Sequence, residues 1–190
     1  ITFFEYLLKL KGYDIENATN EIKHYNSLSL AEKHNLQNTK RWSIYNYHFN
    51  NNKFYNSLNG NIHQSDWSKI PITEKKDYQQ NLGKLLSKDF HKNNVFIANT
   101  SGSSGHPFFY AKDKFSHAIT WALIKQRYDI YSLNLNSKQA RFYGQALENS
   151  SYYRESIKDL IMNRVRFPIF DMSDSILTKF LKKFKKHSFL

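Results

Sequence analysis

The sequence predicts an α/β protein in which a helical N-terminal segment is followed by alternating strands and helices. Two observations support this fold class. Apolar residues recur at helical spacing through the first 36 residues, and from residue 95 onwards short β-rich runs alternate with helical patterns. Because the chain shows no internal repeat and no linker, we predict a single domain over residues 1–190, helical over 1–90 and α/β over 113–190.

The N-terminal half contains three features that define its elements. Gly12 is placed to end a first helix, because glycine readily adopts the conformation that follows a helix C-terminus. Residues 39–60 carry aromatic side chains at helical spacing, which we interpret as a packing stripe. Residues 66–82 predict an extended Ile-Pro-Ile followed by a helix with Thr73 as its N-cap, since Pro71 disfavours helix in the residue before it.

The middle of the chain predicts a hairpin over residues 95–111. The β-rich runs 95–98 and 108–111 flank a loop rich in glycine and serine. Asp113 follows directly and is a suitable N-cap for a helix that extends to about Ser132.

The last third predicts two further strands and two helices. Residues 138–147 predict a strand that ends at Gly144, and residues 166–172 a second extended segment. Residues 150–165 and 174–186 predict helices. The second of these helices has its apolar residues on one face and its lysines elsewhere, so we expect the lysines to be solvated.

The composition excludes several classes of site. The chain has no cysteine, so disulfides, thiolate metal sites and cysteine nucleophiles are excluded, and the histidines show no zinc-type spacing. No run approaches the roughly 20 apolar residues of a membrane-spanning helix, and no targeting segment is recognisable. We therefore expect a cytoplasmic protein without integral membrane association. The net charge of +12 favours anionic partners.

The stretch "TSGSSGHP", residues 100–107, is the strongest candidate site. Two residues separate Gly102 from Gly105, and His106 follows, so the stretch is neither a Walker A loop nor a nucleophile elbow. The two glycines allow backbone N–H groups to converge on an anion, and no aspartate or glutamate occurs from residue 90 to 112. Further donors for phosphate oxygens come from the hydroxyls of Thr100, Ser101, Ser103 and Ser104. The alternative is an ordinary surface loop.

The same stretch resembles the phosphate-binding loop of the adenylate-forming enzymes, which include acyl-CoA synthetases and luciferases. Thr100 to Pro107 match the loop pattern of that superfamily at every defined place. Phe108 follows the proline, as is usual in the phenylacetate–CoA ligase-like branch, which includes CapK-like proteins found with polysaccharide genes. "KIPITEKKDYQQN", "WSIYNYHFNNNKFY" and "RFYGQ" resemble other stretches of this branch; the first matches through Pro71, Lys75, Asp77 and Asn81.

The resemblance implies ATP-dependent activation of a carboxylic acid as an acyl-adenylate, followed by transfer to a thiol such as coenzyme A. The loop residues that would grip the β- and γ-phosphates of ATP are Thr100, Ser101, Gly102, Ser103, Ser104 and Gly105. Tyr143 and Gly144 would line the acyl pocket. The resemblance places this chain in the N-terminal part of the large domain. It assigns the Mg²⁺ ligands and the catalytic lysine to segments beyond Leu190, so we assign no catalytic residue here and expect the 190 residues alone to be inactive.

Two alternatives remain open from the sequence. The positive charge and the aromatic residues would suit a nucleic-acid-binding module, although the basic residues are spread along the chain and no known recognition motif occurs, so we predict no nucleic-acid partner. Helix 174–186 has the basic amphipathic form of a peripheral membrane anchor.

Overall fold

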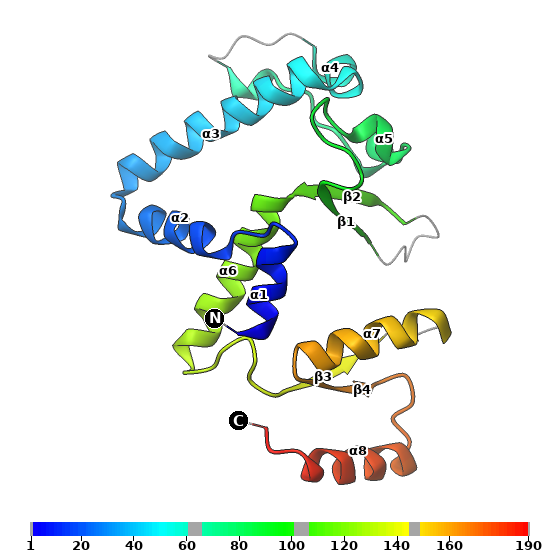
Figure 1. Ribbon diagram of the computed structural model, residues 1–190. Helices are drawn as coiled ribbons and strands as arrows, with labels where there is room; N and C mark the ends of the chain where they lie inside the picture. The colour runs from blue at the N-terminus through cyan, green and yellow to red at the C-terminus, as the bar shows by residue number, and fades with distance from the viewer. Residues whose placement is uncertain (1, 61–65, 101–106, 145–148, 190) are drawn as a thin grey trace. The chain divides into compact units, whose positions relative to one another are not determined.

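The computed structural model describes residues 2–60, 66–100, 107–144 and 149–189 (Figure 1). These residues form a mixed α/β structure that is mainly helical, so the broad fold class is confirmed. Their strands form two separate two-stranded sheets. The chain divides into two compact units: the hairpin unit, Tyr13–Ala122, and the crossover unit, which combines Ile1–Gly12 with Leu123–Leu190.

Four helices build most of the hairpin unit, and short polar side chains fix where they begin. Ser29 and Glu32 exchange hydrogen bonds at the start of one helix, where the Glu32 carboxylate accepts from the Ser29 N–H at 2.8 Å. Asp14 accepts from the Asn17 N–H at 3.0 Å at the start of another. The helices are α2 (Ile15–Ser27), α3 (Leu30–Asn51), α4 (Lys53–Asn59) and α5 (Leu82–Leu85).

The aromatic stripe of residues 39–60 forms a packed cluster, as predicted. Tyr45 is only 2% exposed, and its ring lies 5.7 Å from that of Trp42, 5.8 Å from that of Phe49 and 6.1 Å from that of Tyr55. Its hydroxyl donates to the carbonyl of Gly60 at 3.0 Å, so the one polar atom of this buried ring is satisfied.

The helix predicted within residues 66–82 is wrong, and so is its N-cap, Thr73. The segment forms two short 3-10 turns, η1 (Trp67–Lys69) and η2 (Lys75–Tyr78). The second turn begins at Glu74, whose N–H donates to the Asp77 carboxylate at 2.7 Å. Aspartate and asparagine side chains here bond to nearby backbone N–H groups, and these local bonds compete with a continuous helix.

The predicted hairpin and the helix that follows it are confirmed. Strands β1 (Val95–Asn99) and β2 (Phe109–Asp113) pair antiparallel. Asp113, the last residue of β2, accepts hydrogen bonds from the N–H and the hydroxyl of Ser116, both at 2.7 Å. Asp113 thereby caps α6 (Lys114–Ile130), as the sequence predicts.

The crossover unit is a strand–helix–strand arrangement that also contains one helix on each side of it and the C-terminal part of α6, Leu123–Ile130. Its elements are α1 (Phe3–Leu10), β3 (Gln139–Tyr143), α7 (Asn149–Ile161), β4 (Arg164–Pro168) and α8 (Asp174–Lys186). β3 and β4 are parallel, so the chain must cross over between them, and α7 provides this connection. Gly12, at a φ of 82°, follows the end of α1 as predicted.

Phe167 of β4 forms the centre of the crossover unit. It is fully buried, its ring stacks on that of Phe142 at 5.0 Å, and it meets the edge of Phe180 of α8 at 5.3 Å. The apolar face of α8 therefore packs on this strand pair. The lysines of α8 are exposed, as predicted, and one of them, Lys183, also donates to the carbonyl of Arg166 at 2.7 Å.

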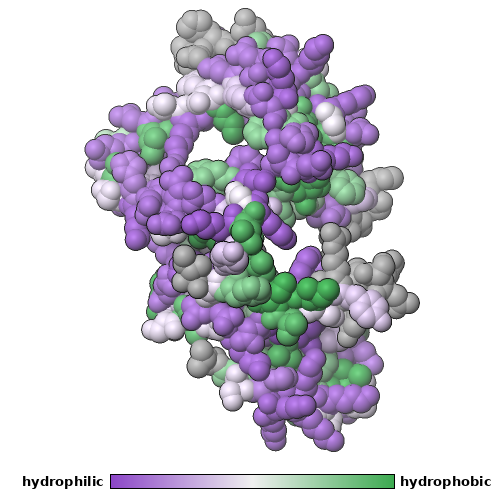
Figure 2. Space-filling model, in the orientation of Figure 1, coloured by the Kyte–Doolittle hydropathy of each residue, from purple (hydrophilic) through white to green (hydrophobic). Residues whose placement is uncertain are grey.

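Hydrophilic side chains cover much of the visible face of the molecule, with smaller apolar areas between them (Figure 2). Several large apolar residues are nonetheless more than half exposed, among them Leu181 and Phe142. None of the described helices combines the length and the apolar character needed to cross a membrane.

Candidate functional site

The candidate phosphate loop emerges from the open end of the β1–β2 hairpin. The last pair in the strand register is Asn99 with Phe109. One step further, the Thr100 N–H donates to the carbonyl of Phe108 at 3.0 Å, and the Phe108 N–H donates to the Thr100 hydroxyl oxygen at 3.1 Å. The Thr100 hydroxyl is the acceptor in this second bond, so the bond does not use the hydroxyl proton, which can donate to a ligand.

Thr100 is the member of the predicted loop whose position can be given. The other predicted residues, Ser101, Gly102, Ser103, Ser104 and Gly105, lie outside the described residues. The two strands hold Thr100 and Phe108 next to each other, so the two ends of the intervening segment are fixed.

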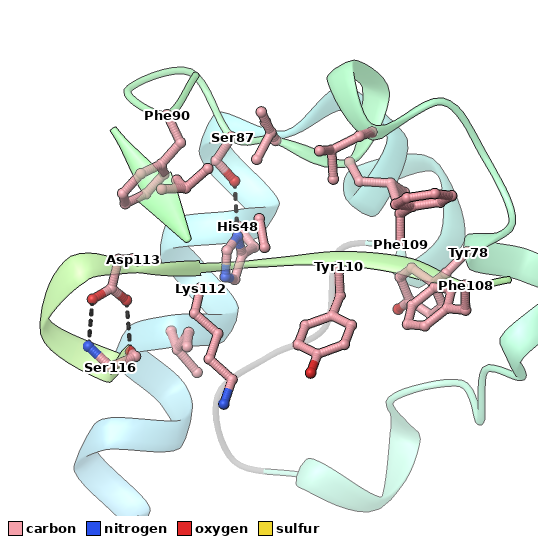
Figure 3. Close-up of a pocket in the computed structure, with 16 residues that line it drawn as sticks. His48, Tyr78, Ser87, Phe90, Phe108, Phe109, Tyr110, Lys112, Asp113 and Ser116 are labelled. Atoms are coloured by element: carbon pink, nitrogen blue, oxygen red, sulfur yellow. Dashed lines mark hydrogen bonds between the residues drawn. The ribbon is translucent and has the colours of Figure 1, made fainter. Parts of the chain in front are cut away.

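A pocket of about 330 Å³ lies beside the hairpin (Figure 3). Phe108 and β2 form one wall of the pocket, and α3 and residues 82–90 form the others. Figure 3 shows Tyr110 and Lys112 pointing to the same side of β2, as the alternation of side chains along a strand requires. Lys112, on strand β2 of the hairpin, is a cationic side chain in the lining of this mostly apolar pocket.

His48 and Ser87 form a hydrogen-bonded pair at this pocket, with His48 Nδ1 at 2.8 Å from the serine hydroxyl oxygen (Figure 3). Burial lowers the pKa of His48 below its usual value, which favours the neutral imidazole. A serine beside a neutral histidine is the arrangement of an activated nucleophile. Ser87 is only 3% exposed, however, and in the described part of the chain no carboxylate contacts His48.

The surroundings of this pair indicate a structural role. Asn52 Nδ2 donates to the carbonyl of Leu85, and the Lys88 N–H donates to the carbonyl of Asn51, both at 2.9 Å. The His48–Ser87 bond is therefore one of three that join the C-terminal end of α3 to residues 85–88. Sequence reasoning missed the pair because the two residues are distant in the chain and neither belongs to a motif.

Tyr143 and Gly144, the predicted acyl-pocket residues, lie at the carboxyl end of β3 in the crossover unit. The Tyr143 ring faces two arginines, with the guanidinium of Arg166 at 4.2 Å and that of Arg141 at 5.6 Å from its centroid. Among the described residues, a Cβ added to Gly144 would approach only the Ile169 side chain, at 3.9 Å, which is an ordinary contact. Space alone therefore does not require glycine at this position.

The neighbouring residue, Phe142, points to the opposite face of the sheet. There it lines an apolar pocket of about 370 Å³ together with Phe167 and residues of α8. Thr100 belongs to the hairpin unit, whereas Tyr143 and Gly144 belong to the crossover unit.

In the described residues, no group of three or more histidine, aspartate or glutamate side chains is placed to hold a metal ion. Comparison with protein-family models, with curated proteins and with solved structures gives no match for this chain.

Proposed function

We propose that this chain provides the phosphate-binding part of an adenylate-forming enzyme, an acid–thiol ligase of the phenylacetate–CoA ligase-like branch. The substrates are ATP and a carboxylic acid, and coenzyme A is the acyl acceptor. The proposal depends on one observation: the stretch "TSGSSGHP" joins two antiparallel strands whose pairing continues to Thr100 and Phe108. Successive N–H groups of a glycine- and hydroxyl-rich segment between two strands can converge on a phosphate.

The chemistry explains why such a loop is needed. A carboxylate is a poor electrophile, and its attack on the α-phosphate of ATP brings two anions together while pyrophosphate leaves. N–H and hydroxyl donors that are already oriented stabilise this negative charge without reorganising. Thr100 suits this task because its hydroxyl oxygen is held by the Phe108 N–H while its proton stays free. Lys112, on the adjacent strand, adds a positive charge at the neighbouring pocket.

Mg²⁺ would offset the charge of the phosphates when bound with ATP. Because the described residues offer no cluster of acidic or histidine ligands, we assign no metal ligand to them.

Gly102→Val tests the proposal in the full-length protein. A branched side chain in the loop would crowd the phosphates and remove the conformational freedom of glycine, so we expect ATP–pyrophosphate exchange to be abolished while the fold is retained. Circular dichroism checks the fold. Gly83→Ala controls for the loss of a glycine at an exposed position outside the loop; a Cβ there would lie 3.3 Å from the Asn81 side-chain oxygen, so that side chain must shift slightly. Exchange that is unchanged in Gly102→Val would refute the loop assignment.

A further inference from the structure

Arginines are concentrated on one face of the β3–β4 pair. In the parallel register Gln139 is opposite Arg164, and Arg141 is opposite Arg166. Side chains alternate between the faces of a strand, so all three guanidinium groups project from the same face. Arginine is rarely buried without a partner, and the partners of these three therefore indicate what the face can bind.

Arg166 is fully compensated by acidic residues of α7. Its Nε and Nη2 donate to the two carboxylate oxygens of Asp159 at 2.8 and 3.1 Å. Its Nη2 also donates to one oxygen of Glu155 at 3.2 Å, and the other oxygen of Glu155 pairs with Lys158. These hydrogen bonds raise the pKa of Arg166. Every oxygen of the two carboxylates is thus already engaged.

Arg141 and Arg164 have no such partner in the part of the chain that the structure describes. The Nε of Arg141 is buried and makes no hydrogen bond, and its guanidinium lies 5.6 Å from the centroid of the Tyr143 ring. Arg164 donates only to the neutral Gln139 oxygen, at 3.3 Å. Burial and the charge of Arg141 lower the pKa of Arg164, which indicates that the two cations are close together.

We infer that Arg141 and Arg164 bind a phosphate group on this face of the crossover unit. A buried guanidinium N–H without an acceptor, such as the Nε–H of Arg141, is costly, and an oxyanion between the two half-buried arginines would remove that cost. A phosphate monoester carries a charge of about −1.5 to −2, which matches two uncompensated arginines better than a single carboxylate does. Its three free oxygens can also accept from two planar guanidinium forks at once.

The site is distinct from the proposed ATP loop. Thr100 and the loop belong to the hairpin unit, whereas Arg141 and Arg164 belong to the crossover unit. The inference therefore extends to a second phosphate, carried by an acceptor or a regulatory ligand, and it does not depend on the adenylation proposal.

Inorganic phosphate titrated into the full-length protein at constant ionic strength tests the inference, with the Nε–H resonances of the arginines followed by NMR. We expect the Arg141 signal to shift on addition of phosphate and to shift much less with acetate. Arg141→Gln and Arg164→Gln should each lose about tenfold or more in phosphate affinity, since each removes a charge-assisted contact. Arg127→Gln, which removes the same charge from an exposed position in α6, should keep the wild-type affinity.

The outcomes separate this site from the loop and from general charge effects. Gly102→Val should leave the Arg141 shift intact, so failure of the ATP loop would not affect this result. Arg141→Lys keeps the charge but not the fork, and it provides a second variant if the glutamine variant does not fold. An equal phosphate affinity in the wild type and in both glutamine variants, or no movement of the Arg141 signal, would overturn the inference. A response to acetate as strong as that to phosphate would overturn the assignment to phosphate.

Discussion

His117 shows how one side chain can make the stability of the hairpin unit sensitive to pH. Its ring stacks on Phe96 at 3.7 Å and meets the Tyr13 ring edge-on at 5.0 Å. The Trp121 indole N–H donates to its Nε2 at 3.1 Å, so this nitrogen is an acceptor and the imidazole is neutral. Burial, and to a smaller extent Lys112, lower the pKa of His117 below its usual value. Protonation would break the bond to Trp121.

We predict that the hairpin unit loses stability as the pH falls below about 6.5, the usual histidine pKa. In that range the unfolded chain binds a proton that folded His117 does not, so the free energy of unfolding decreases as the pH falls. Above the usual histidine pKa, the stabilising contribution of the neutral His117 is fully present. His48, whose pKa burial also lowers, contributes in the same direction. Urea unfolding between about pH 5 and 8 measures the effect.

The matched variants for this prediction are both histidine-to-glutamine changes. His117→Gln should flatten the pH dependence, and His24→Gln, at an exposed position of α2, controls for the loss of a histidine as such. The prediction fails if His117→Gln keeps the full wild-type dependence.

At the scale of elements, the strands and helices with strong local signals were predictable. The hairpin strands, the Asp113 cap and α8 follow from β-rich runs, a capping residue and an amphipathic pattern, each contained within a few turns of chain. The helix predicted within residues 66–82 does not form, because Asp77 and other short polar side chains bond to nearby backbone N–H groups, and a possible cap such as Thr73 does not reveal this competition.

Contacts between distant elements could not be predicted. The sequence favours a strand ending at Gly144 and an extended segment after residue 166, but nothing local fixes their parallel register, and the register is what places Arg141 opposite Arg166. The His48–Ser87 bond and the neighbours of Tyr143 depend on tertiary packing in the same way.

The packing of α8 on β4 leads to a stability prediction. Phe167→Ala removes a fully buried ring that contacts Phe142 and Phe180, so we expect the crossover unit to lose about 3–5 kcal/mol. Thermal and urea unfolding measure this loss. Leu181→Ala, on the same helix but 63% exposed, should change stability by no more than about 0.5 kcal/mol. Equal losses in the two variants would show that α8 does not pack through this ring.

At the scale of the whole molecule, 28 lysine and arginine side chains face only 16 aspartate and glutamate side chains, so ion pairs cannot neutralise every cation. Many of the pairs in the described residues lie at the surface, such as Lys76 with Glu74, and contribute little to stability. The Arg166–Asp159 pair is less exposed, and within the described residues neither Arg141 nor Arg164 beside it has a hydrogen bond to a carboxylate. Part of the excess positive charge is therefore located at Arg141 and Arg164 on the β3–β4 pair.

The two sheets differ in how far the chain must travel to close them, and this difference has a kinetic consequence. The connection between β1 and β2 comprises residues 100–108, whereas β3 and β4 are separated in the chain by residues 144–163, which include α7. Closing the longer segment costs more chain entropy before any contact repays it. We expect pulsed hydrogen exchange during refolding to protect the amides of β1 and β2 before those of β3 and β4. Protection of both sheets at the same rate would contradict this order. If β1 and β2 are protected first, closure of the segment between β3 and β4 limits how fast the crossover unit refolds.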